Sequence, residues 1–164
     1  MRQRRRFFDF PNPVNEVAAR AVATGVALLA TTILLTRAWW LLWPLAYGFV
    51  ARVLTGPRLS PLAQVAVRIV APRLPARPVA GSPKRFAQGI GAVVTTSTVV
   101  LHYASGADTI VLGLLGAMVV FASLEAAFGF CVGCKIFGGL VRLGWVDNAY
   151  CDDCQPRTRT VPAS

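Results

Sequence analysis

Four long apolar stretches dominate the pattern of hydrophobic and polar positions along the chain. They cover residues 17–36, 39–54, 86–107 and 109–130. The charged side chains inside them are Arg20, Arg52 and Glu125. A helix needs roughly 20 residues to cross a bilayer, and its backbone groups must pair within the segment. We therefore predict an all-α, polytopic membrane protein with a four-transmembrane-helix bundle, in which the short second helix is kinked or begins near Pro44.

The composition of the 164-residue chain supports this fold class. Hydrophobic residues make up 55% of the chain and charged residues only 15%, against about 25% charged residues in soluble domains. The mean hydropathy of +0.55 leaves too little polar surface to cover a soluble core. Intrinsic disorder is excluded as well, because disordered chains have low hydrophobicity.

The basic residues predict the orientation in the membrane. Every Lys and Arg except Arg20 and Arg37 lies on one side of the predicted bundle, and such an excess marks the cytoplasmic face. We expect a multi-pass protein of the cell membrane with both termini cytoplasmic. Its segments are a basic cytoplasmic N-terminal segment (1–16), helices 1 and 2 (17–54), a basic cytoplasmic loop (55–85), helices 3 and 4 (86–130) and a cytoplasmic, cysteine-bearing C-terminal segment (131–164).

The net charge of +10 does not indicate nucleic acid, because the cations follow the membrane sides and lack interleaved stacking aromatics. The partner expected from the pattern is the lipid bilayer. In the loop 55–85, which carries no acid, Ser60 and Pro61 predict a short surface helix running to about Ala71. Anionic lipid is a candidate partner there, at about 1 kcal/mol per cation. Residues 75–83 read as a linker.

Four cysteines follow the last apolar stretch with the spacing C-x2-C-x16-C-x2-C, and they are Cys131, Cys134, Cys151 and Cys154. On the cytoplasmic side structural disulfides are disfavoured. The spacing lies within the range of a four-thiolate zinc site, which makes zinc a candidate cofactor.

Redox chemistry is the alternative interpretation of the same cysteines. Cys131 is expected at the start of an amphipathic surface helix with Lys135 nearby, and both features stabilise a thiolate. Cys131 is therefore the candidate nucleophile and Cys134 the candidate resolving thiol. Four inert thiols are a third interpretation, and the sequence leaves all three open.

One carboxylate lies within the predicted membrane region. Glu125 is expected to face the bundle, to be protonated, or to pair with Arg20, which enters the membrane from the same side. A structural ion pair is favoured over a proton relay to the cysteines, since nothing else in the sequence forms a relay.

The sequence resembles an uncharacterised family of small bacterial four-helix integral membrane proteins, classed as a domain of unknown function. The resemblance spans roughly residues 9–145. It rests on the stretches 56–61 (GPRLSP), 85–89 (RFAQG) and, above all, 129–134 (GFCVGC), which matches a GFCxGC signature after the last transmembrane helix. Association of such members with thioredoxin-like or sulfurtransferase proteins implies thiol or sulfur handling by Cys131 and Cys134.

Three functions follow as hypotheses. The leading one is a membrane protein that handles thiols or sulfur through its cytoplasmic CxxC pair, with a thioredoxin-like or sulfurtransferase partner. The first alternative is a non-enzymatic scaffold with a structural four-cysteine zinc site. The second is a quinone-linked thiol oxidoreductase, a class that keeps its cysteines outside the cytoplasm.

Overall fold

The computed structural model describes residues 14–75, 77–79 and 81–145, and 83% of these are helical. In chain order the elements are β1 (Val14–Asn15), α1 (Glu16–Thr36), η1 (Trp39–Leu41), α2 (Leu42–Thr55), α3 (Pro61–Val65), η2 (Ala66–Val70), η3 (Ala71–Arg73), β2 (Pro78–Val79), α4 (Gly81–Val100), η4 (Leu101–Ser105), α5 (Asp108–Phe128) and α6 (Val132–Arg142). The elements η2 and η4 are π-helical, whereas η1 and η3 are 3₁₀ turns.

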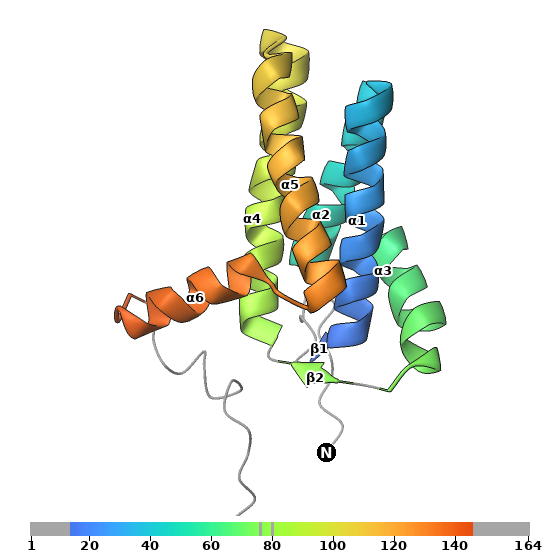
Figure 1. Ribbon diagram of the computed structural model, residues 1–164, viewed down its shortest axis with the longest axis vertical. Helices are drawn as coiled ribbons and strands as arrows, with labels where there is room; N and C mark the ends of the chain where they lie inside the picture. Colours follow the sequence, from blue (N-terminus) through green and yellow to red (C-terminus); the bar gives the residue numbers. More distant parts are fainter. Residues whose placement is uncertain (1–13, 76, 80, 146–164) are drawn as a thin grey trace, which may run out of the picture.

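The long helices form a bundle in which α1 lies beside α5 and α2 beside α4 (Figure 1). Its core is made of fully buried aliphatic side chains from α1, α2 and α5, namely Ala30, Ile33, Leu42, Val111 and Leu115. Close approach of α2 and α4 depends on Gly91, because a Cβ atom there would lie 2.2 Å from the ring of Phe49. Small residues at helix contacts are the usual means of such packing in membranes.

Two helices, α1 and α5, are long and apolar enough to cross a membrane, each with 21 residues. The other two long helices do not reach that standard. With 14 residues, α2 spans about 21 Å, which is less than the ~30 Å of hydrocarbon. The first turns of α4 carry the charged Lys84 and Arg85. The helical class is thus confirmed, together with two candidate membrane spans.

The outer surface of the bundle is apolar. Leu35 at the end of α1 is 80% exposed and Phe128 at the end of α5 is 78% exposed, and large hydrophobic side chains of α2 and α4 also face outward. Contiguous apolar surface of this kind is rare on soluble monomers and marks contact with lipid or with another protein.

The helix limits differ most from the sequence prediction at the start of the third helix. The third helix begins at Gly81, not at residue 86. Pro83 suits a first helical turn because its missing N–H needs no partner there, and the charge of Lys84 is matched by Glu125 on α5. Within the predicted linker, β2 pairs antiparallel with β1 and closes one end of the bundle.

The short helix predicted in the central loop is confirmed. Ser60 caps it by accepting a hydrogen bond from the N–H of Ala63, and Pro61 is its first residue. The helix continues from α3 through η2 and η3 to Arg73. Both α3 and η2 pack against α1, which places this segment beside the β1–β2 pair at the end of the bundle that we call the basal end (Figure 1).

At the opposite end, an aromatic cluster surrounds the one histidine of the chain. His102 stacks on Trp39, with ring centroids 4.4 Å apart, and its Nδ1 lies 2.6 Å from the carboxylate of Asp108. The histidine is therefore satisfied by contacts that join η1, η4 and α5.

Candidate functional site: a dithiol and a buried charge cluster

The local sequence at the end of α5 places two cysteines at the start of α6. Gly129 adopts a left-handed conformation, with φ of 68°, and ends α5. Cys131 is then the N-cap of α6, with an extended backbone, and Cys134 lies in the first turn. From this turn α6 runs sideways out of the bundle at its basal end (Figure 1). Both sulfurs thus lie at the positive end of a helix dipole, as predicted.

The two thiols are free and have different surroundings. Cys131 is 7% exposed, whereas Cys134 is half-buried. The hydrogen bond from the Cys134 thiol holds the pKa of Cys131 below its usual range, and the positive charge of Lys84 adds to this effect. The same hydrogen bond raises the pKa of Cys134, and burial raises it further. Cys131 is therefore the more acidic thiol of the pair.

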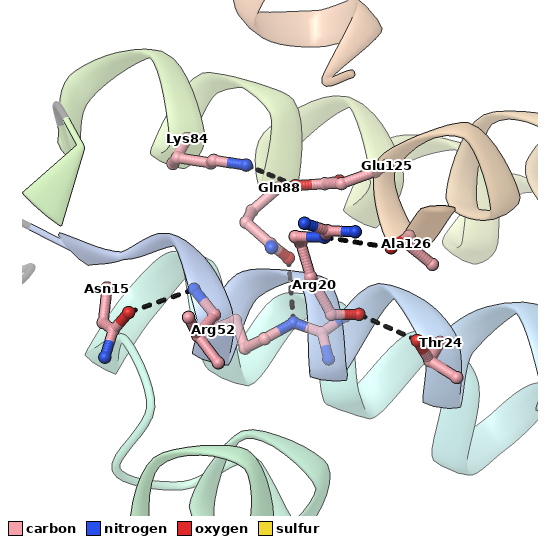
Figure 2. Close-up of polar contacts among 9 residues, drawn as sticks. Asn15, Arg20, Thr24, Arg52, Lys84, Gln88, Glu125 and Ala126 are labelled. Atoms are coloured by element: carbon pink, nitrogen blue, oxygen red, sulfur yellow. Dashed lines mark hydrogen bonds and ion pairs between the residues drawn. The ribbon is translucent and has the colours of Figure 1, made fainter. Parts of the chain in front are cut away.

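Lys84, on the first turn of α4, is the cation that acts on this dithiol, whereas Lys135 lies over the ring of Phe130, 5.7 Å from its centroid. The ammonium of Lys84 pairs with Oε1 of Glu125 across the basal end (Figure 2). The side chains of Lys84 and Glu125 are 9% and 20% exposed. The ion pair therefore joins α4 to α5 in a largely dry environment.

Arg20 does not pair with Glu125, although the sequence offered that pairing as one option. Its Nε donates to the carbonyl of Ala126 at 3.0 Å, and its Nη2 donates to the carbonyl of Ala127 at 2.6 Å. These are among the last carbonyls of α5, which have no partner inside the helix. Arg20 thus caps α5 from the neighbouring α1 (Figure 2), and Glu125 faces the bundle with Lys84 as its partner.

The sequence analysis missed Arg52 as a site residue, because a cation at the end of an apolar stretch reads as a determinant of topology. In the structure Arg52 is only 4% exposed. Its Nε donates to Oε1 of Gln88 at 2.8 Å (Figure 2), and its Cζ lies 4.3 Å from the centroid of the Phe49 ring. Within the described part of the chain, Nη2 of Arg52 is the buried side-chain nitrogen or oxygen that has no hydrogen-bond partner.

Two cavities meet at Arg52 and Gln88. The first, of about 310 Å³, is lined mainly by apolar side chains of α1, α4 and α5, and Glu125 and Cys131 also line it. The second, of about 490 Å³, lies among α1, α2, α3, η2 and α4, and its polar lining includes Asn15 and Lys84. Cys131 therefore borders an apolar cavity, and Arg52 borders both cavities.

The four-cysteine zinc site predicted from the sequence includes Cys151 and Cys154, which lie outside the described residues. Among the residues that are described, no group of three or more His, Cys, Asp or Glu side chains gathers to hold a metal ion. Cys131 and Cys134 supply two of the four ligands that a structural zinc ion requires.

The fold and the site define a helical-bundle protein with two helices fit to span a membrane and a dithiol at one end. A family model described as a domain of unknown function, DUF4395, matches residues 14–142, and the chain belongs to this family. The match covers every described helix, so it includes Cys131 and Cys134, whereas Cys151 and Cys154 lie beyond it. No curated protein and no solved structure matches the chain.

Proposed function

We propose that the chain is a multi-pass membrane protein that carries out thiol–disulfide or sulfur exchange through Cys131 and Cys134. The partner is a cytoplasmic thioredoxin-like or sulfurtransferase protein. The observation that carries the proposal is the position of two free thiols at the start of α6, with Cys131 as the N-cap residue and Cys134 in the first turn. The pKa of Cys131, which its hydrogen bond with Cys134 lowers, agrees with this role. An acidic thiol beside a less acidic one is the arrangement that exchange requires.

The membrane part of the proposal starts from the two apolar spans, α1 and α5. Two further helical segments adjoin these spans: η1 and α2 together cover residues 39–55, and α4 and η4 together cover residues 81–105. In this proposal they complete a bundle of four crossings. The apolar outer surface of the bundle supports contact with lipid. The distribution of Lys and Arg then puts the basal end and both termini in the cytoplasm.

The exchange proceeds in two steps. The Cys131 thiolate attacks one sulfur of a partner disulfide, so that a mixed disulfide forms and the other partner sulfur leaves as a thiolate. Cys134 then loses its proton and attacks the Cys131 sulfur, which releases the second partner sulfur. Two electrons pass to the partner, whose thiolates take up two protons, and a Cys131–Cys134 disulfide remains; the reverse steps regenerate the dithiol.

Burial of Cys131 limits how a protein partner reaches it. Among the described elements, α6 packs mainly on α4, and Gly133 sits close to Ala87 of that helix. Exchange with a folded partner therefore requires α6 to move away from α4, which brings Cys131 to the surface. The half-buried Cys134 stays near the mixed disulfide that it must resolve.

The test uses the full chain in liposomes with a thioredoxin variant whose second active-site cysteine is replaced by serine and whose remaining cysteine carries a thionitrobenzoate disulfide, so that the leaving group is thionitrobenzoate. Cys134→Ser is expected to accumulate a mixed disulfide with thioredoxin, seen by mass spectrometry under non-reducing conditions, because the resolving thiol is missing. Cys131→Ser is expected to form none. The Cys151→Ser/Cys154→Ser double variant serves as the matched control and should exchange at the wild-type rate. Exchange that persists in Cys131→Ser, or that is lost in the control, contradicts the proposal.

The apolar cavity beside Cys131 favours one alternative oxidant, a membrane quinone. A quinone takes two electrons and two protons from the dithiol, which leaves a quinol and a Cys131–Cys134 disulfide. Decylubiquinone added without oxygen to the reduced, detergent-solubilised protein should then protect both thiols from later alkylation. Thiols that stay fully reactive in this arm exclude the quinone route and leave exchange with a protein partner to be judged by the trapping experiment.

A further inference from the structure

Arg52 is a buried cation that forms no ion pair with any residue that the structure describes. The side chain is 4% exposed, and its Nε contacts the neutral amide of Gln88. Glu125 attracts the charge of Arg52 through space, but its carboxylate is bound to Lys84. A buried charge is costly unless it is paired and hydrogen-bonded, and Nη2 of Arg52 is without a hydrogen-bond partner. The guanidinium is therefore set up to receive an acceptor from outside the described chain.

The larger cavity, of about 490 Å³, offers the space for that acceptor. Among the described residues, Arg52 and Lys84 are its charged lining residues, and no carboxylate lines it. The smaller cavity, in contrast, is lined by Glu125, whose negative charge repels an anion. The remaining lining of the larger cavity is mostly apolar, with Val22 from α1, Ala63 from α3 and Val67 from η2 among its side chains. An anionic group attached to an apolar body fits such a surface.

We propose that this cavity binds the phosphate group of an anionic membrane lipid, with the guanidinium group of Arg52 as the donor. Guanidinium groups bind phosphate oxygens strongly because the hydrogen bond is charge-assisted. Lys84 adds long-range attraction while it keeps its bond to Glu125. An acyl chain then follows the apolar wall between α1 and η2. A neutral carbonyl ligand satisfies the hydrogen bond but brings no negative charge to Arg52 and Lys84, so the anion is the better occupant.

The site differs from the cysteine chemistry and stands independently of it. The test measures dissociation constants by microscale thermophoresis for the full chain in a non-ionic detergent. The probes are dioctanoyl-phosphatidylglycerol, dioctanoyl-phosphatidylcholine and inorganic phosphate. We expect the anionic lipid to bind at least about tenfold more tightly than the zwitterionic one, because the choline cation of the latter offsets the attraction of Arg52 and Lys84 for its phosphate.

Variants locate the binding at Arg52. Arg52→Gln should weaken binding of phosphatidylglycerol about tenfold or more, whereas Arg68→Gln, an exposed cation on η2, should change it little. Ala71→Leu keeps every charge but fills part of the cavity that Ala71 lines, so it should also weaken binding. The Ala71→Leu variant, checked for helical content by circular dichroism, keeps the test decisive if Arg52→Gln does not fold.

Each other outcome overturns the proposal. Equal binding of the two lipids removes the role of the charge, and tight binding in a folded Arg52→Gln variant removes the role of the guanidinium. Inorganic phosphate that binds as tightly as phosphatidylglycerol shows that a free anion, not a lipid, is the occupant. Binding that disappears in Arg68→Gln assigns the lipid to the loop surface.

Discussion

The ion pair between Lys84 and Glu125 is expected to be the largest single polar contribution to the stability of the basal end. We consider the variants Lys84→Met and Glu125→Leu, which replace each charged side chain by an apolar one of similar size. Either substitution alone leaves the other charge in a site where Lys84 is 9% and Glu125 20% exposed. The remaining charge then loses its partner without gaining free access to water.

The magnitude follows from this burial. Breaking a buried pair by removing one partner costs about 3–5 kcal/mol, and the partial exposure of Glu125 places the expected loss near 3 kcal/mol. At roughly 2–4 °C per kcal/mol for a chain of this length, the midpoint of thermal unfolding should fall by roughly 6–12 °C. The double variant should lie within about 1 kcal/mol of the wild type, because a well-packed apolar pair replaces a buried ion pair at little cost.

The assay is a double-mutant cycle on the detergent-solubilised protein, with unfolding followed by circular dichroism. Lys135→Met is the matched control, since Lys135 is an exposed cation over Phe130 and its loss should cost less than about 1 kcal/mol. Single variants that unfold with the wild-type midpoint, or a double variant whose loss is the sum of the two single losses, would refute the reasoning, because both results mean that the charges are effectively solvated.

Two further predictions concern the dithiol. The pKa of Cys131 is lowered by the hydrogen bond from Cys134, so its rate of alkylation by iodoacetamide should rise at a lower pH than that of an ordinary thiol. Cys134→Ala should shift this pH profile to higher pH and slow alkylation at pH 7. An unshifted profile means that the hydrogen bond does not lower the pKa. Gly133→Ala places a Cβ atom 2.6 Å from Cβ and 2.7 Å from Cα of Ala87, so α6 must move away from α4 at a cost of roughly 1–3 kcal/mol, and Cys131 should be alkylated faster. The control Gly138→Ala places its Cβ atom in open space and should leave the alkylation rate unchanged. Equal rates in the two variants contradict the packing of α6 on α4.

Several features of the fold were readable from the sequence because they depend on local chemistry. The long apolar runs gave α1 and α5 almost to the residue, and Ser60 with Pro61 gave the start of α3, since capping needs only neighbouring positions. The start of α6 at Cys131 followed in the same way from the glycine and the change of pattern after α5. The helical class and the family membership needed no tertiary information.

The partners of the charged side chains could not be predicted from the sequence. Lys84 was assigned to the loop because it precedes an apolar run, yet α4 begins before it and its charge is matched by Glu125, 41 positions away. Arg20 was a candidate partner for that carboxylate, but it donates its hydrogen bonds to backbone carbonyls at the end of α5 instead. Such pairings depend on which helices lie side by side, and composition does not contain that information.

The sequence by itself determined the helices, the spacing of Cys131 and Cys134 and the excess of basic residues, because each is a property of neighbouring or summed residues. Only the tertiary structure decided that Lys84 acts on the dithiol, that Cys131 borders a cavity, and that Arg52 is buried with a free donor. The physical reason is that helix contacts fix the distance between charges, and burial strengthens each of those interactions.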